Sequence, residues 1–324
     1  MTTTSPTPPA PARSSARGWR ALWPGLSAMA LLGSSVAVID ATRALPVFAL
    51  QSARYAVAVV AIVVFARLFG VPLVLPRLRD LGWVLGGAAT GLIGFNLATI
   101  VGTAHAEPAF LGAAVGCIPL VLALAAPLTA ARRPAPRLVV GAVIVSAGAI
   151  AVTGWGRADP LGVLMGLALI ACEAGLTLFG ARALPRMGAW SYSAATCAVA
   201  ALVFGALSVV AERPDPAVLV SPAALGAVVY LGAIATALAF VLWFTGVGRM
   251  GADAAGLCAG TAAPTAALVA ASLGAALPSL GAWLGMAAIA LGLVIGFAPS
   301  VSARRQRRRT ASPQPERGTV PRRR

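Results

Sequence analysis

Ten apolar runs, each about 20 residues long, dominate the sequence. That is the length an α-helix needs to cross a hydrocarbon core of ~30 Å, and the runs lack the alternation of a membrane β-barrel. With 59% hydrophobic and 10% charged residues, the chain is too apolar for a soluble globular protein. We therefore predict an all-α membrane protein with ten transmembrane helices. The expected spans are 23–40, 46–66, 81–103, 108–130, 137–154, 161–180, 189–210, 222–247, 252–274 and 279–299.

The net charge of +16 comes from arginines in short loops and near the two ends of the chain, because the sequence has no lysine. Positive charges near the ends of membrane spans are retained in the cytoplasm. In the loops opposite the termini, only Arg43, Arg157 and Arg213 are basic. We therefore expect both termini to be cytoplasmic and no nucleic acid to be bound. Arginine without lysine, with heavy use of alanine, indicates a bacterial protein of the cytoplasmic (inner) membrane.

The residues that the sequence lacks exclude several chemistries. Without lysine there is no Walker A phosphate loop and no lysine Schiff base. His105 is the single histidine, so a multi-histidine metal or haem site is impossible. The four cysteines lie on different spans without Cys-x-x-Cys spacing, and are expected to pack. We expect no cofactor, no metal and no catalytic residue.

The two halves of the chain share an internal repeat. The tetrapeptide Arg-Ala-Leu-Pro occurs at Arg43–Pro46 and again at Arg182–Pro185, and Pro119 in span 4 matches Pro264 in span 9. A unit of five spans repeated in tandem inserts its second copy upside down, and such inverted repeats are typical of secondary transporters. The predicted units are residues 23–154 and 155–299, flanked by disordered basic segments at 1–22 and 300–324.

Further motifs carry a resemblance. They are Tyr230–Trp243, Gly251-Ala252, Pro264 and Gly285 in the second half, and Gly94-Phe95-Asn96, Pro119 and Gly141 in the first. With these motifs the sequence resembles the drug/metabolite transporter superfamily, in particular the EamA-type permeases of ten helices, over residues from about 25 to 299. Arg54 stands where that family often has an arginine in helix 2. Members often carry an acidic residue near the end of helices 4 and 9; Ala131 and Ala275 stand there in this chain, so its role is not carried over.

Two charged residues fall deep within predicted spans, Glu173 in span 6 and Arg54 in span 2. A charge near the middle of a bilayer costs several kcal/mol unless it is paired, protonated or wetted, so each residue is a functional-site hypothesis. In that hypothesis the two share a polar cavity, where Glu173 exchanges a proton or binds a cationic substrate. Arg54 then serves as its counter-charge or as an anchor for anions. The alternative is a structural ion pair that orients the bundle without touching substrate.

Four further residues complete the predicted pathway. Asn96 is a candidate hydrogen bonder in a cavity, with an interhelical hydrogen bond as the alternative. Trp243 is a candidate aromatic wall of that cavity, or else an anchor at the membrane interface. Pro119 and Pro264 lie within spans 4 and 9, where proline frees a backbone carbonyl and kinks the helix. We expect these two prolines to act as paired hinges or cavity elements.

The sequence as a whole predicts a secondary transporter that moves a small metabolite or drug-like compound by alternating access. Export is implied by the family resemblance alone. The expected partners are the small-molecule substrate, the lipid bilayer and, if the transporter is an antiporter rather than a uniporter, protons. Two rivals stay open: a non-transporting scaffold or lipid-handling protein, and an intramembrane enzyme, for which no catalytic motif is found. Substrate, coupling ion and oligomeric state are left open.

Overall fold

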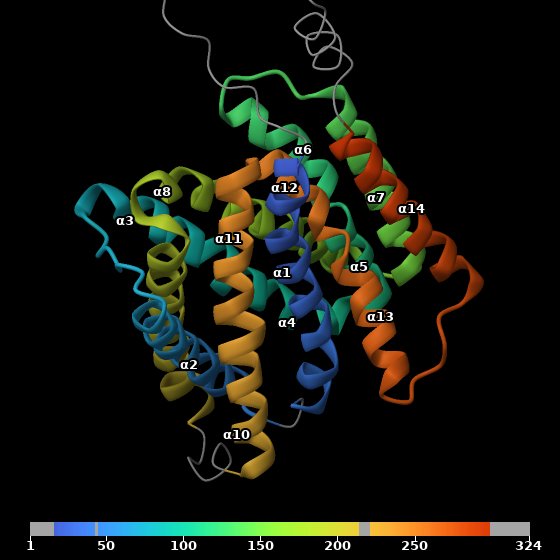
Figure 1. The fold of residues 1–324 in the computed structure, drawn as a ribbon. Coiled ribbons are helices and arrows are strands. Elements are labelled where there is room, and N and C mark those ends of the chain that lie inside the picture. The colour runs from blue at the N-terminus through green and yellow to red at the C-terminus, as the bar shows by residue number, and fades with distance from the viewer. Residues whose placement is uncertain (1–15, 43–44, 214–220, 299–324) are drawn as a thin grey trace, which may run out of the picture.

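The computed structural model describes residues 16–42, 45–213 and 221–298. Within them the chain is helical throughout, with a single isolated bridge between Ala106 and Ala158 in place of any strand (Figure 1). The elements, with η marking π-helical segments, are α1 (Ala16–Ala41), α2 (Val47–Leu68), α3 (Leu78–Gly87), η1 (Ala88–Gly94), α4 (Phe95–His105), α5 (Pro108–Gly116), α6 (Ile118–Thr129), α7 (Pro136–Thr153), α8 (Pro160–Leu207), η2 (Ser208–Glu212), α10 (Pro222–Val229), η3 (Tyr230–Leu238), α11 (Ala239–Met250), α12 (Ala252–Ala259), α13 (Ala262–Ser272) and α14 (Leu280–Phe297).

Eight helical stretches of the described chain are long and apolar enough to cross a membrane. One of them, Pro160–Glu212, runs for 53 residues and contains both predicted spans 161–180 and 189–210. It is not straight, because Gly188 has φ 70° and ψ 170°, a conformation that glycine adopts without steric cost. α1 is a further helix of 26 residues, and it begins at Ala16 where the sequence predicted a disordered segment up to residue 22. The predicted tail 300–324 lies outside the described residues.

The helix ends define two sides of the molecule. The start of α1 and the ends of α11 and α14 lie at the same end of the molecule (Figure 1). The bend of α8 at Gly188 lies there too, because Arg182 and Pro185 line one cavity with Thr129 at the end of α6 and Gly251 at the end of α11. We call this the arginine-rich side. Its described arginines are Arg67, Arg77, Arg79, Arg132, Arg133, Arg137, Arg182, Arg186 and Arg249.

Two of the membrane-length stretches are broken just before a proline. α5 ends at Gly116 and α6 begins at Ile118, which places Pro119 in the first turn of α6. α12 ends at Ala259 and α13 begins at Ala262, with Pro264 in its first turn. Proline has no N–H to donate to the preceding turn and its ring crowds that turn, so the helix is interrupted.

Besides η2 at the end of α8, two other stretches contain a π-helical segment in their interior. η1 joins α3 to α4, and η3 joins α10 to α11. A π-helical segment leaves part of the regular hydrogen-bond ladder unmade and is frequent at functional sites. In this chain both segments adjoin the buried polar residues described below.

α7 and α14 form the most extensive helix pair of the described chain, and glycines let them touch. A β-carbon added at Gly148 would lie 2.6 Å from the carbonyl oxygen of Gly285, and one added at Gly285 would lie 2.6 Å from that of Gly148. Gly141 and Gly292 show the same reciprocal relation at 2.7 Å. Small residues of this kind permit the close backbone approach that drives helix association in membranes.

Candidate functional site

Five polar side chains from α2, α4 and η3 form one hydrogen-bonded network. Arg54 donates from Nε to Thr236 Oγ1 at 2.7 Å and from Nη1 to Gln51 Oε1 at 3.5 Å. Gln51 in turn donates to Asn96 Oδ1, and Asn96 Nδ2 donates to the Tyr55 hydroxyl at 2.9 Å. We call these five residues the buried polar network. It joins α2 to the two stretches that contain η1 and η3.

The guanidinium of Arg54 is buried, and no acidic side chain that the structure describes pairs with it. Arg54 is 8% exposed, and its Cζ lies 5.5 Å from the ring centroid of Tyr55, in cation–π range. A guanidinium has five N–H donors, and Thr236 and Gln51 take one each. Arg54 therefore keeps both positive charge and donors for another group.

Glu173 lies on the face of α8 that points to α11. Thr177 and Gly180, one and two turns further along α8, contact Trp243 and Phe244 of α11, and residues at this spacing share a helix face. Glu173 is half-buried and makes no hydrogen bond or ion pair with any residue that the structure describes. Its carboxyl group lies within electrostatic range of Tyr55. Glu173 and Arg54 thus lie near the same tyrosine without forming the ion pair that the sequence left open.

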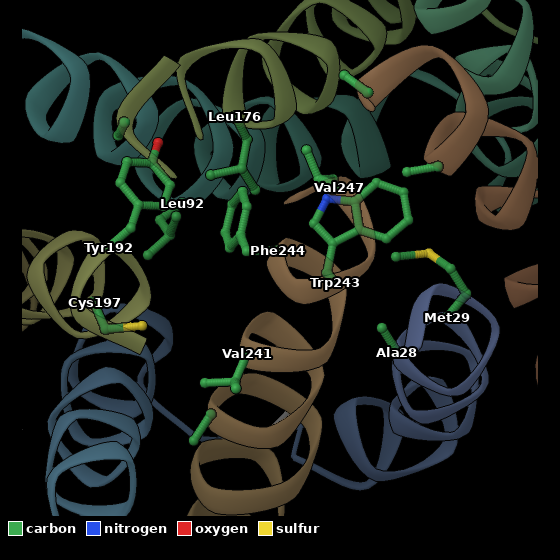
Figure 2. Packing of buried hydrophobic residues seen from close by; sticks show 14 of the residues in the cluster. Ala28, Met29, Leu92, Leu176, Tyr192, Cys197, Val241, Trp243, Phe244 and Val247 are labelled. Carbon is green, nitrogen blue, oxygen red and sulfur yellow. The ribbon is translucent and has the colours of Figure 1, made fainter. Parts of the chain in front are cut away.

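Trp243 closes the space between α11 and α8. Its Nε1 donates to Thr177 Oγ1 at 3.2 Å, and its side chain is almost completely buried. Figure 2 shows the indole pointing from α11 toward α8, next to Phe244 of the same helix. Burial of this kind is not that of an interface anchor, so of the two predicted roles the structure places Trp243 in the interior.

A cavity of about 360 Å³ opens on the arginine-rich side. Its wall comes from the end of α6, the middle of α8 and the junction of α11 with α12, and the lining residues include Thr129, Arg132, Leu178, Arg182, Pro185, Val247 and Gly251. Val247 lies one turn from Trp243 on α11, and Leu178 adjoins Thr177 on α8. Each residue of the Trp243–Thr177 pair is therefore within one turn of a lining residue on its own helix.

The groups follow one another along α8 in a fixed order. From the arginine-rich side these are Arg182 and Leu178, which both line the cavity, then Thr177, and then Glu173 one turn further along the helix. At ~1.5 Å per residue, Glu173 lies roughly 13 Å along the helix from Arg182. Thr236 of the buried polar network lies seven positions before Trp243 on η3 and α11, so the network lies deeper still.

On the opposite side, two side-chain contacts join the end of α4 to the segment before α8. His105 Nδ1 lies 2.8 Å from Asp159 Oδ2, and Arg157 Nε lies 2.9 Å from Glu107 Oε1. Asp159 also accepts from the backbone N–H of Gly162 at 2.8 Å, which caps the start of α8. Glu107 precedes α5 at the capping position, but its carboxylate turns to Arg157 instead.

These contacts lower the pKa values of both carboxyl groups. The hydrogen bond from the Arg157 side chain lowers the pKa of Glu107. The hydrogen bond from the Gly162 backbone, followed by that from His105, lowers the pKa of Asp159.

Of the six residues predicted for the pathway, the structure joins Arg54 to Asn96 in one network and places Glu173 one turn from the partner of Trp243. Pro119 and Pro264 lie at helix breaks and not in the cavity wall. Sequence reasoning missed the partner residues Gln51, Tyr55, Thr177 and Thr236. A signal existed for the first two, because Gln51, Arg54 and Tyr55 recur at helical spacing on an otherwise apolar span.

Comparison with known proteins gives the fold and the family. One solved structure, titled "Crystal structure of protein", superposes with a TM-score of 0.74 at 23% sequence identity, covering 89% of this chain and 99% of that chain. At this identity the likeness shows a shared fold alone. No curated protein sequence matches the chain.

A family model matches the second half of the chain. Residues 160–297 match the EamA-like transporter family, which is part of the drug/metabolite transporter superfamily. Its members are transporters of small compounds rather than enzymes. The matched range begins at the first residue of α8 and ends at the last residue of α14. The predicted resemblance is therefore confirmed: residues 160–297 of this multi-pass membrane protein match the EamA-like transporter family.

Proposed function

We propose that this chain is a secondary transporter that moves a small compound by alternating access, and that the structure is its state open to the arginine-rich side. One observation carries the proposal. A cavity opens on the arginine-rich side, and its lining residue Leu178 adjoins Thr177, the partner of Trp243, with Glu173 one turn further along α8. A static scaffold has no need for an ionisable side chain within a membrane span beside such a cavity.

Alternating access is supported by a symmetry between the halves. The same sequence offset separates Gly141 from Gly285 and Gly148 from Gly292, so the two glycine contacts between α7 and α14 exchange when the halves are exchanged. The broken helices before Pro119 and Pro264, and the π-helical segments η1 and η3, are further matching pairs. We infer ten membrane crossings arranged as two inverted five-helix units over residues 23–154 and 155–299, with Gly188 and α1 supplying the crossings beyond eight.

Glu173 is the proposed site of proton coupling. Its carboxyl group has no hydrogen-bonding or ionic partner in the described chain, and Glu173 lies one turn along α8 from Thr177, the partner of Trp243. A half-buried carboxyl group within a membrane span and without a fixed partner is suited to alternate between proton and substrate. Arg54, Asn96 and Trp243 are proposed to contact substrate, while Pro119 and Pro264 are proposed hinges.

Orientation and direction complete the proposal. The arginine-rich side carries most loop arginines, which favours a cytoplasmic location for it and for both termini in a bacterial inner membrane. Loading from a cytoplasmic cavity corresponds to export.

The proposal is tested by flux. Purified protein in nanodiscs is first screened by thermal stability against amino acids, nucleosides, sugars and cationic drugs at two pH values, since a ligand at 100 times its Kd adds ~2.7 kcal/mol. Each compound that stabilises the protein is then followed across sealed proteoliposomes. We expect protein-dependent flux whose pH dependence is lost in Glu173→Gln. Binding without flux at either pH would favour the scaffold reading instead.

A further inference from the structure

The cavity on the arginine-rich side is lined by charge of one sign. Arg132 and Arg182 lie in its wall, and none of its described lining residues is acidic. Its remaining wall is mainly apolar, with Leu178, Leu184 and Val247. A concave site of a few hundred Å³ with an apolar wall and a few placed polar groups has the character of a small-molecule site.

Arg182 is held in place before any ligand arrives. Its Nη2 donates to the carbonyl oxygen of Thr129 at the end of α6, and its Cζ lies 5.9 Å from the ring centroid of Trp83 on α3. A guanidinium held between two helices loses little side-chain freedom on binding, and it keeps further N–H donors for a second acceptor.

Arg132 is positioned by its backbone. The chain leaves α6 through Ala131, which has φ 51°, and the N–H of Arg132 donates to the carbonyl oxygen of Pro127 at 2.8 Å. This left-handed helix ending fixes the direction in which the chain leaves α6. It puts Arg132 into the same wall as Arg182, although 50 positions separate them in the sequence.

We propose that this cavity binds the anionic group of a small compound with an apolar body, with Arg132 and Arg182 supplying the positive charge. The anionic group is a carboxylate or a phosphate, for which forked guanidinium donors are well matched. If the cavity is where a transported compound first binds, the substrate of the transporter is an organic anion; this step rests on the proposed function. The unpaired guanidinium of Arg54, deeper in the bundle, is then the next positive group on its way.

Asp253 provides an internal check on the sign of the charge. It lies in the first turn of α12, beside the lining residues Gly251 and Ala252, and no described residue pairs with it. A carboxylate at this place repels an anionic ligand. Asp253→Asn is therefore expected to tighten anion binding, whereas it would weaken the binding of a cation.

The experiment uses four probes with one ring and different charge: benzoate, phenyl phosphate, benzylammonium and benzyl alcohol. Their binding to the full-length protein in phosphatidylcholine nanodiscs is measured by thermal stability and by calorimetry. We expect the two anions to bind more tightly than the other two, and added salt to weaken them. Arg132→Gln and Arg182→Gln are each expected to lower anion affinity roughly tenfold. Arg213→Gln, on the opposite side and outside both of its side-chain contacts, is the matched control and leaves affinity unchanged.

A second arm separates a free compound from a lipid headgroup. Nanodiscs that contain phosphatidylglycerol weaken benzoate binding if that lipid occupies the cavity, and leave it unchanged if the cavity is reserved for free anions; either result supports an anion site. Equal affinity for benzoate and benzylammonium overturns the inference. So does unchanged benzoate affinity in the double variant Arg132→Gln/Arg182→Gln. Anion binding without flux in proteoliposomes counts against the transporter alone. Flux of benzylammonium or benzyl alcohol without anion binding counts against the anion site alone.

Discussion

Arg186 forms a bidentate ion pair with Asp80, in which Nη1 lies 2.6 Å from Oδ1 and Nη2 lies 2.8 Å from Oδ2. Asp80 is almost fully buried at the start of α3, while Arg186 lies in α8 just before Gly188. The same carboxylate accepts from the backbone N–H of Arg77 at 3.0 Å. One buried carboxylate therefore fastens the first turn of α3 to the bend of α8.

Removal of Arg186 leaves that carboxylate buried and without its ionic partner. We expect Arg186→Gln to lower the free energy of unfolding by about 2 kcal/mol, below the full cost of a broken buried pair because Arg186 is partly exposed. The measurement is a denaturant or thermal unfolding curve in mild detergent. The control is Arg133→Gln on the same side. Arg249→Gln is less suitable, because Arg249 has contacts of its own. An equal loss of unfolding free energy in Arg186→Gln and Arg133→Gln would mean that the net positive charge, and not the Asp80–Arg186 pair, stabilises the protein.

The glycine contacts between α7 and α14 predict a steep cost for added bulk. A β-carbon at Gly148 would lie 2.6 Å from a backbone oxygen that cannot move without its helix, so Gly148→Ala is expected to cost about 1–3 kcal/mol. Gly226→Ala in α10 is the matched control, because nothing lies within 4 Å of a β-carbon there. The two variants are compared by thermal unfolding. A Gly148→Ala protein as stable as the control would contradict the close packing of these helices.

The carboxyl groups of Glu107 and Asp159 predict a dependence of stability on acid. Both have pKa values lowered in the folded protein, so their contribution is present above the unfolded pKa values of about 4 and is lost as pH falls through the folded ones. We expect the melting temperature to fall below about pH 4. Glu107→Gln and Asp159→Asn should each start lower near neutral pH and fall less in acid. Parallel curves for variant and wild type would show that these groups are not the cause.

The hydrogen bond between Trp243 and Thr177 predicts a small coupling energy. Interhelical hydrogen bonds in membrane proteins are worth about 0.6 kcal/mol on average. Trp243→Phe, Thr177→Val and the double variant form a cycle that isolates this term from the packing of the indole. The cycle is measured by thermal unfolding, and additive effects would show that the bond contributes nothing.

Arg54 predicts opposite effects on stability and on transport. Replacement of a buried charge by an apolar side chain of similar length is often neutral or stabilising, so Arg54→Met is expected to keep or raise the melting temperature. Transport of any compound identified in the flux screen is expected to be lost. If Arg54→Met unfolds the protein, the guanidinium is a structural element of the network; Arg54→Lys, which keeps the charge without the forked donors, then separates the two roles.

The sequence predicted the helices of this fold well, because span length and hydropathy are set locally by the bilayer. Spans such as 108–130 and 137–154 agree closely with the observed Pro108–Thr129 and Pro136–Thr153. The interruptions were only partly predictable. Pro119 and Pro264 indicate the two helix breaks. No residue type indicates the π-helical segments η1 and η3, which depend on how neighbouring helices pack.

The sequence predicted the charged residues of the candidate site but not their hydrogen-bond partners. A charge in an apolar span is conspicuous in any sequence, which is why Glu173 and Arg54 were found. Their partners are threonine, glutamine and tyrosine, which occur in membrane helices for many reasons, and Thr236 joins Arg54 across 182 positions. A single sequence carries no signal for such a pairing.

Gly188 joins the two arms of α8 through a single residue, where two separate helices would need a loop. It lies two positions after Arg186, so the Asp80–Arg186 ion pair fastens the bend to α3. One arm carries Glu173. The other runs on to Glu212, whose carboxylate accepts from the backbone N–H groups of Phe48 and Ala49 in the first turn of α2. A continuous chain of helix and hydrogen bonds thus connects the helix of Glu173 with the helix that carries Arg54.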